Sequence, residues 1–260
     1  MPHSTSSIQL TNRGLFVTGT DTQVGKTMVT AALGIALQRM ELNIGVMKPI
    51  ETGIEYGTPK KPDDGDRLHH LLAPEELKEL VTPYRFKKSL APLEAARQAK
   101  SGIQFEVIAE AYHTLAARHD YMIVEGVGGV MVPLTEEYDI RDLIKMLQLP
   151  CLLVSRTALG AVNHTRLTLA ALRDSGIPVL AIVLNETQQL AGSTDHAIQQ
   201  ESTVKLLRQL CPVPIVGPIL YQASLGQDWE AGVTILSRTL EFCELATRIL
   251  ETAVESPKSP

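Results

Sequence analysis

Short runs of consecutive apolar residues alternate along this chain with longer segments in which apolar residues recur at helical spacing. The short runs predict six strands, at residues 15–18, 44–48, 121–125, 151–155, 179–184 and 213–217. After the first run, apolar residues recur every three or four positions and predict a helix from about Lys26: Val29, Ala32, Leu33, Ala36 and Leu37.

The predicted strands are apolar at successive positions instead of at every second one. This pattern is typical of a parallel sheet that is covered by helices on both faces. We therefore expect a three-layer α/β/α fold with a mostly parallel central sheet, in which ligands bind at the carboxyl ends of the strands. We expect one domain over residues 14–255, with a flexible leader at 1–13 and a flexible tail at 256–260.

Composition narrows the possible partners. The formal net charge is −5, and basic residues are not concentrated anywhere, so neither nucleic acid nor an anionic membrane is an expected partner. No segment approaches the run of about 20 apolar residues that a membrane helix requires. The three cysteines (Cys151, Cys211 and Cys243) are odd in number and far apart, which favours a reducing compartment and a cytoplasmic protein.

The strongest chemical signal is the sequence GTDTQVGKT at residues 19–27, between the first predicted strand and the first predicted helix. A glycine-containing loop at a helix N-terminus turns backbone N–H groups toward a phosphate. Lys26 would bind the β- and γ-phosphates of ATP, and the Thr27 hydroxyl would bind Mg²⁺. The alternative is a helix-capping turn with an incidental lysine. We expect the nucleotide to contact Thr20, Asp21, Thr22, Gln23, Val24, Gly25, Lys26 and Thr27.

The loop departs from the commonest phosphate-binding form. Five residues separate Gly19 from Gly25 instead of four, and Thr20 stands where the first glycine usually lies. Partition-type ATPases carry a lysine early in the related loop, where this chain has Asp21. This difference argues against such an ATPase, which remains the main alternative and would act on a protein partner. A second alternative, an amidotransferase-type synthetase for corrin rings, would need a glutaminase domain after Leu220.

Further motifs follow the loop in a fixed order: KPIETG at 48–53, Asp66 before a helix, VEGVGG at 124–129, LGAVNHT at 159–165, and Asn185. Together with the loop, they resemble the dethiobiotin synthetases over about Leu15 to Leu220. That family joins 7,8-diaminononanoate, CO₂ and ATP into dethiobiotin, ADP and phosphate. One amine captures CO₂ as a carbamate, phosphoryl transfer activates the carbamate, and the second amine closes the ureido ring.

The resemblance implies a role for two lysines and two threonines. Lys26 would follow the transferred phosphoryl group, and Lys48 would hold the carbamate and the mixed anhydride, because both steps concentrate negative charge. Thr22 and Thr52 would orient the carbamate and the diamine. The alternatives are a solvent-exposed lysine at a strand end and ordinary turn threonines.

The resemblance also implies a Mg²⁺ site made of Thr27, Asp66 and Glu125, which offer the hard oxygen ligands that Mg²⁺ prefers. Glu125 ends an apolar strand, where an unpaired carboxylate would be costly. Asp66 follows Asp63 and Asp64, so a solvated acidic loop is its alternative.

Two glycine-containing segments complete the expected site. Gly126, Gly128 and Gly129 would let the backbone approach the nucleotide, and Asn185 would contact the adenine edge. Residues Gly160, Ala161, Val162 and Asn163 open a predicted helix whose free N–H groups would bind the substrate carboxylate. In the family this contact comes from a partner subunit, so the resemblance implies a homodimer with active sites at its interface. The alternatives are a tight turn, a turn asparagine and a helix cap.

One position departs from the commoner family pattern, because Gln23 stands where many members carry glutamate. This substitution removes a negative charge beside the phosphates, so Mg²⁺ affinity or nucleotide choice can differ in this chain.

Overall fold

The computed structural model describes residues 14–54, 62–188 and 194–254. The leader predicted at 1–13 and the tail predicted at 256–260 lie outside the described residues, as does Glu255, the last residue of the predicted domain.

Six parallel strands form the central sheet. They lie in the order β2-β5-β1-β6-β7-β8, so that β1 is flanked by β5 and β6. Their bounds are β1 Gly14–Gly19, β2 Ile44–Met47, β5 Tyr121–Gly129, β6 Cys151–Arg156, β7 Val179–Asn185 and β8 Ile215–Ile219. Each of the six predicted strands is present, and the parallel sheet is confirmed.

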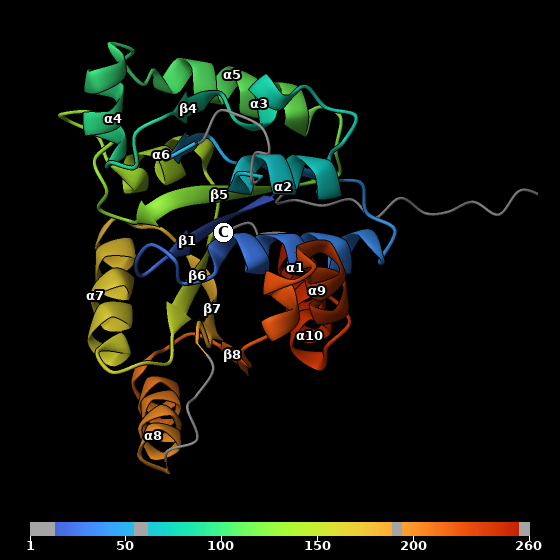
Figure 1. Cartoon of the computed structure of the whole chain (residues 1–260), viewed down its shortest axis with the longest axis vertical. Helices are drawn as coiled ribbons and strands as arrows, with labels where there is room; N and C mark the ends of the chain where they lie inside the picture. Colours follow the sequence, from blue (N-terminus) through green and yellow to red (C-terminus); the bar gives the residue numbers. More distant parts are fainter. Residues whose placement is uncertain (1–13, 55–61, 189–193, 255–260) are drawn as a thin grey trace, which may run out of the picture.

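Helices cover both faces of this sheet, which confirms the three-layer architecture (Figure 1). One face carries α1 (Lys26–Gln38), α2 (Asp64–Leu72), α9 (Trp229–Leu236) and α10 (Leu240–Val254). The short helix α3 (Lys78–Val81) contacts both α2 and α5. The other face carries α4 (Pro92–Ala99), α5 (Phe105–Ala116), α6 (Ile140–Leu147), α7 (Ala161–Asp174) and α8 (Thr194–Leu210). A short 3₁₀ helix, η1 (Ala223–Gly226), precedes α9.

The strands are continuous apolar runs because alternate residues of each strand face opposite sides of the sheet, and both sides are buried. Successive side chains of a strand point to opposite faces of the sheet. In β1, Leu15 and Val17 therefore pack into the core beneath α1, whereas Phe16 packs into the core beneath α5 and α6. Because both faces are buried, odd- and even-numbered positions of the strand must both be apolar.

The segment between β2 and β5 contains elements that the apolar pattern did not predict. Two three-residue strands, β3 (Ile50–Thr52) and β4 (Tyr84–Phe86), pair in parallel as a separate small sheet. Strands this short are too brief to show a period of two. They matter for the site because β3 begins two residues after Lys48 and carries Glu51 and Thr52 into the same region.

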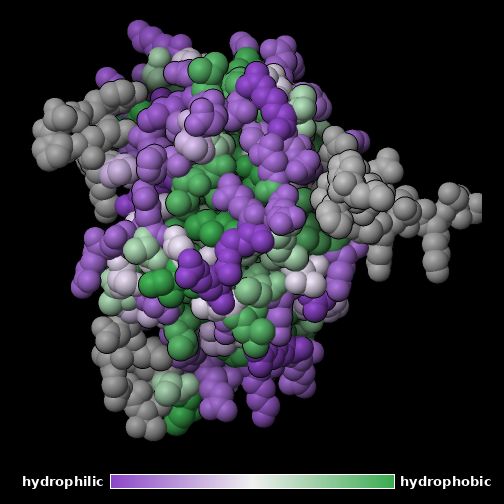
Figure 2. Space-filling model, turned by 90° about the vertical axis from the view of Figure 1, so that its right-hand side faces the viewer, coloured by the Kyte–Doolittle hydropathy of each residue, from purple (hydrophilic) through white to green (hydrophobic). Residues whose placement is uncertain are grey.

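The surface shown in Figure 2 has hydrophobic side chains gathered toward its middle, with hydrophilic side chains around them.

Among the helices of the described residues, none combines the length and the apolar character that crossing a membrane would require.

Candidate active site

The phosphate loop connects β1 to α1 and is held from the end of β7. Gly25, which precedes the first residue of α1, has φ = 99°, a conformation that favours glycine. A Cβ atom at Gly25 would lie 2.2 Å from Nδ2 of Asn185. The same Nδ2 donates a hydrogen bond to the Val24 carbonyl at 3.0 Å. Asn185 therefore fixes the shape of the loop.

Lys26 is the first residue of α1, and only 8% of its surface is exposed. Its Nζ donates to the Asp21 carbonyl across the loop at 2.8 Å. Burial, followed by the nearby charge of Lys48, lowers the pKa of Lys26 to about 8. A buried ammonium with one backbone partner is a strong site for an anion, because an added phosphate oxygen offsets its desolvation.

A second buried lysine lies opposite Lys26. Nζ of Lys48 is 2.5 Å from Oε1 of Glu125, and the same oxygen accepts from the Thr27 hydroxyl at 2.8 Å. Burial alone would lower the pKa of Lys48, but the carboxylates of Glu125, Asp64 and Glu51 outweigh it and raise that pKa above its ordinary value. The other carboxylate oxygen of Glu125, Oε2, is buried without a hydrogen-bond partner among the described residues.

Glu51 positions a further acidic residue beside Lys48. Its carboxylate accepts from the backbone N–H of Asp64 at 2.7 Å and from that of Gly65 at 3.1 Å. These N–H groups open α2, so Glu51 acts as a cap supplied from outside the helix. The cap places Asp64 Oδ2 3.8 Å from Lys48 Nζ. Burial raises the pKa of Glu51 to about 7 even though Lys48 opposes the shift.

These groups surround a cavity of about 430 Å³, which we call the phosphate pocket. A neighbouring cavity of about 300 Å³, the base pocket, is walled by β7, η1 and the segment between β8 and η1. Three residues, Gln23, Gly25 and Met28, line both cavities, so the two pockets are adjacent along the loop and the start of α1. The predicted site residues that line the phosphate pocket are Thr22, Gln23, Gly25, Lys26, Thr27, Lys48, Thr52, Glu125 and Gly128, while Asn185 lines the base pocket.

The structure separates Asp66 from the other two predicted Mg²⁺ ligands. Asp66 Oδ1 lies 2.9 Å from Arg85 and 3.3 Å from Lys78, and Asp66 does not line the phosphate pocket. Asp64 does line it. The sequence could not distinguish these two aspartates, because both lie within the first turn of one helix and differ only in the face on which they lie.

Several predicted residues hold the loop without lining the phosphate pocket. Oδ2 of Asp21 lies 2.5 Å from Nη2 of Arg156 at the end of β6, and Val24 is fully buried. The Thr20 hydroxyl lies 3.5 Å from Ser155 Oγ.

Two predicted glycines of β5 also lie outside the phosphate pocket lining. Gly126 is required for packing, since a Cβ there would lie 2.7 Å from the Phe16 ring. Gly129 leaves only ordinary contact distances around a Cβ.

The predicted carboxylate-binding segment lies elsewhere in this chain. Gly160, Val162 and Asn163, at the start of α7, line a larger cavity of about 1070 Å³ between α7 and α8, and Ala161 beside them is buried. Gly160 has φ = 90° and directly precedes the helix. Within one chain, this larger cavity and the phosphate pocket have no lining residue in common.

Sequence reasoning missed several residues of the phosphate pocket, of which Arg67, Ser89 and Trp229 come from outside the motifs. Glu51 and Val127 lie within the motifs and were not assigned roles. Helical spacing from Asp64 is a signal that could have identified Arg67, which lies three residues later on the same face of α2. Trp229 has no such signal, because it is 165 residues beyond Asp64 in the chain.

The parallel three-layer sheet, the glycine loop at a helix N-terminus and the buried Lys26 define a P-loop nucleotide-binding protein. Two solved structures show the same fold. The MinC:MinD cell division complex of Aquifex aeolicus matches with 14% identity and a TM-score of 0.56, over 95% of this chain and 98% of that one. MinD of Pyrococcus horikoshii OT3 complexed with Mg-ADP matches with 15% identity and a TM-score of 0.51, over 94% and 96%. A family model described as "AAA domain" matches residues 13–228.

Sequence relatives identify the family within this class. An ATP-dependent dethiobiotin synthetase BioD of Thermodesulfovibrio yellowstonii is 38% identical over 83% of this chain and 91% of its own length. Its counterpart in Anaeromyxobacter sp. is 47% identical over 67% and 77%, and that of Bacillus subtilis is 36% identical over 79% and 86%. The chain therefore belongs to the ATP-dependent dethiobiotin synthetase family, whose members are ligases of biotin biosynthesis.

Proposed function

We propose that this enzyme joins 7,8-diaminononanoate and CO₂ at the expense of ATP, giving dethiobiotin, ADP and phosphate. The observation that carries the proposal is the second buried lysine. Lys48 shares the phosphate pocket with Lys26, so the pocket holds two ammonium groups where a nucleotide alone would need one. The second ammonium suits a substrate that itself becomes an acceptor of the phosphoryl group.

The proposed reaction has three steps. One amine of the diamine forms an N–C bond to CO₂ and loses a proton, giving a carbamate. A carbamate oxygen then takes the γ-phosphoryl group of ATP, and the bond from that phosphorus to the ADP oxygen breaks. Finally, the second amine attacks the carbamoyl carbon, the C–O bond to phosphate breaks, and loss of a proton leaves the cyclic urea.

The two lysines divide these steps between them. Lys26 remains with the transferred phosphoryl group. Within the described residues its ammonium donates to the Asp21 carbonyl alone, which leaves two N–H donors for phosphate oxygens. Lys48 is held by Glu125 at the opposite side and neutralises the carbamate and the mixed anhydride. Thr22 and Thr52 line the same pocket and orient the carbamate and the diamine.

A Mg²⁺ ion fits the oxygen-rich side of the phosphate pocket. Thr27 and Glu125 are already in contact, and the unpartnered buried Oε2 of Glu125 requires a cation or donor. We propose Asp64 as the third protein ligand in place of Asp66. When bound, Mg²⁺ supplies charge neutralisation to the phosphates. The protein residues fix its position through Glu51, which orients the start of α2.

The nucleotide extends from the phosphate pocket into the base pocket. Asn185 uses its amide N–H₂ group on Val24, which leaves its Oδ1 atom for the adenine edge. Gln23, Gly128 and the loop backbone complete the contacts on the phosphate side. We propose ATP as the co-substrate on this basis and on the resemblance of the chain to its ATP-dependent relatives.

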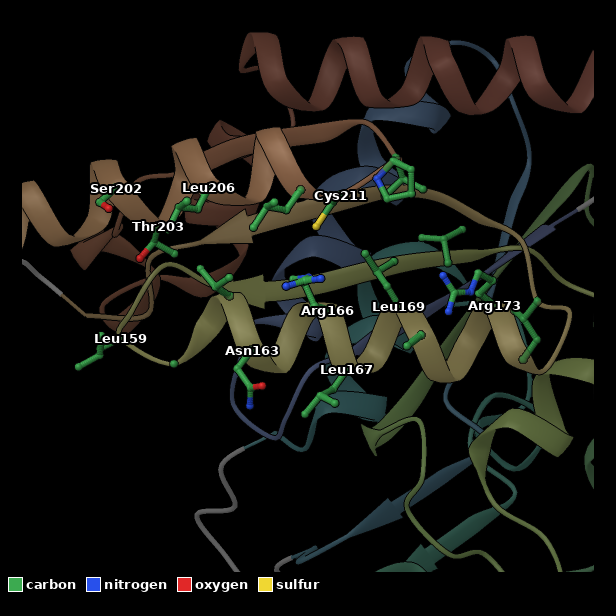
Figure 3. A pocket seen from close by; sticks show the side chains of 18 of the residues that line it. Leu159, Asn163, Arg166, Leu167, Leu169, Arg173, Ser202, Thr203, Leu206 and Cys211 are labelled. Carbon is green, nitrogen blue, oxygen red and sulfur yellow. The ribbon is translucent and has the colours of Figure 1, made fainter.

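A homodimer would complete the active site. The start of α7 lies outside the phosphate pocket of its own chain, and exposed leucines surround it: Leu159 is 85% exposed and Leu167 61%. In Figure 3, Asn163 and Leu167 extend from α7 on the side away from α8, and Leu159 lies in the segment just before α7. We propose that a second copy covers this side of α7 and receives residues Gly160–Asn163 at its own substrate site.

The proposed location is the cytoplasm. All three cysteines are free thiols, and Cys151 and Cys211 are buried, so the protein suits a reducing compartment.

Mass-spectrometric detection of dethiobiotin tests the reaction. The protein is mixed with 7,8-diaminononanoate, bicarbonate, ATP and Mg²⁺, and ADP release is measured in parallel. Dethiobiotin formed in equal amount with ADP supports the proposal. ATP hydrolysis that proceeds without the diamine, or that responds to a protein partner, would instead favour a switch-type ATPase.

Sedimentation velocity tests the dimer with two leucine variants. Leu167→Asp places a charge on the proposed interface, whereas Leu240→Asp changes a leucine of similar exposure (69%) on α10. The dimer should dissociate only in the first variant. Identical sedimentation of both variants and the wild type as monomers would refute the interface.

A further inference from the structure

Arg67 is a cation of the phosphate pocket that has no ion-pair partner among the described residues. It lies on α2, three residues after Asp64, and lines the same pocket as Thr27 and Met28. Within the described part of the chain, its guanidinium forms no hydrogen bond and no ion pair. The nearby Arg85 provides the contrast, because it is bound to both Asp63 and Asp66. A partly buried guanidinium therefore has its N–H donors available to a ligand.

Trp229 holds this guanidinium in place. The Cζ atom of Arg67 lies 5.0 Å from the centre of the Trp229 ring, within the range of a cation–π contact. Trp229 is the first residue of α9 and packs against the core beneath α1. The side chain of Asp228 caps α9 by accepting from the backbone N–H of Ala231 at 3.0 Å. The tryptophan is thus anchored, and it limits the rotamers open to Arg67.

The location of the pair indicates which anion it binds. Both α2 and α9 pack on α1, whose first turn carries Lys26, Thr27 and Met28. Met28 also lines the base pocket, so this side of the phosphate pocket leads toward the nucleoside. Thr52 and Ser89 come instead from β3 and from the segment between β4 and α4. A planar guanidinium is well suited to two phosphate oxygens at once.

We propose that Arg67 binds the phosphate chain of the nucleotide and that Trp229 is the positioning residue that orients it. The inference rests on ATP being the co-substrate, as in the proposed function. The matched "AAA domain" region ends at residue 228, so Trp229 is the first residue beyond it. The tryptophan therefore adds a wall to the phosphate pocket from a part of the chain that this family model does not cover.

Calorimetric titration of the full chain with ATP and Mg²⁺, without diamine, tests the proposal separately from the reaction. Arg67→Gln should weaken ATP binding about tenfold or more, since a charge-assisted bond to phosphate is lost. Arg238→Gln, which changes an exposed arginine just after α9, is the matched control and should bind ATP as the wild type does. Because diamine is absent, the result does not depend on whether the protein makes dethiobiotin.

The tryptophan variants test the positioning role. Trp229→Leu should weaken ATP binding in the same direction, Trp229→Phe should restore most of it, and the double variant Arg67→Gln/Trp229→Leu should be little weaker than Arg67→Gln alone. A purely structural tryptophan would instead add its effect to that of Arg67→Gln.

Steady-state kinetics then distinguishes the anion that Arg67 binds. A raised KM for ATP with an unchanged KM for the diamine supports the proposal. Unchanged ATP binding with a raised KM for the diamine would overturn it and assign Arg67 to the substrate. Unchanged values for both ligands would also overturn it, and would leave Arg67 as a side chain that only packs on Trp229.

Discussion

Lys48 and Glu125 form a buried ion pair in which Nζ and Oε1 lie 2.5 Å apart and both side chains are at least 95% removed from solvent. Lys48 follows β2 and Glu125 lies within β5, and these are neighbouring parallel strands. The pair is therefore fixed by the sheet itself. A buried pair of this kind contributes little net stability, but the loss of either partner leaves an uncompensated charge.

Replacement of Lys48 should separate catalysis from nucleotide binding. Lys48→Met is expected to reduce dethiobiotin formation about 100-fold or more, because the charge on the carbamate and the anhydride is no longer neutralised. It should also lower the free energy of unfolding by about 3 kcal/mol, because Glu125 stays buried without its partner. Mass spectrometry, calorimetric titration with ATP and denaturant unfolding measure the three effects.

The double variant Lys48→Met/Glu125→Gln is the control, since it removes the unpaired charge. Stability should recover while product formation stays lost. If ATP binding falls as severely as product formation in Lys48→Met, Lys48 belongs to the nucleotide site instead.

Two aspartates of one helix should differ in their effect on the metal. Asp64→Asn is expected to raise the Mg²⁺ concentration required for half-maximal rate about tenfold or more, because Asp64 lines the phosphate pocket. Asp66→Asn should leave that concentration unchanged and lower stability by about 1–2 kcal/mol, because it weakens the bond to Arg85. A Mg²⁺ titration of both variants checks this, and the reverse result would restore Asp66 as the ligand.

Stability should depend on pH through Glu51. Its folded pKa, about 7, lies above the ordinary value of 4.5, so the folded state binds more protons between these values. The cost of burying the charged form is therefore absent at low pH and fully present above pH 7. Glu51→Gln should be more stable than the wild type at pH 8, by up to roughly 3 kcal/mol, and the difference should shrink toward pH 4.5.

Urea unfolding across this pH range measures the Glu51 effect. Glu110→Gln, an exposed change on α5, provides the reference and should show no such trend. A stability difference that stays constant with pH would mean that Glu51 is not a buried carboxylate in solution.

ATP binding should be coupled to proton uptake at Lys26. The pKa of Lys26 is lowered to about 8, below its ordinary 10.5, so part of the population is neutral at pH 8.5. Phosphate oxygens favour the charged form, and binding should then take up protons. The same depression means that this lysine destabilises the unliganded fold below pH 8 and that the penalty is relieved as pH rises toward 10.5.

Calorimetry at pH 8.5 in buffers of different ionisation enthalpy measures the uptake. Lys26→Arg keeps the charge and stays protonated at this pH, so its binding should release or take up no proton through this position. Equal proton uptake by the wild type and Lys26→Arg would exclude Lys26 as the source.

The sequence predicted the layers, the sheet and the loop because each depends on local order along the chain. Apolar runs such as Leu15–Val17 show a strand buried on both faces, and the loop motif lies between a strand and a helix as the chemistry requires. The choice between Asp64 and Asp66 depends on the rotation of α2 about its axis, which Glu51 fixes from outside the helix. The residues of α2 and its immediate neighbours in the sequence do not determine that rotation.

Trp229 and Arg85 were unpredictable for a related reason. Trp229 reaches the phosphate pocket only because α9 packs back on α1, and Arg85 meets Asp66 only through a three-residue strand. Asn185 is predicted at the adenine edge, and that prediction stands, but the hydrogen bond from its N–H₂ group to Val24 was not foreseen. In each case a long-range contact decides the role of the side chain.

The two adjacent pockets come from different halves of the chain. Apart from Trp229, the residues that line the phosphate pocket lie between Thr22 and Gly128, whereas the base pocket takes its remaining walls from Asn185 to Gly226. The residues that carry the reaction and the residues that select the nucleobase can consequently change independently of each other. Exchanging only the base-pocket walls between Asn185 and Gly226 for those of a relative should retune the preference among nucleoside triphosphates while the ring-closing chemistry is inherited intact.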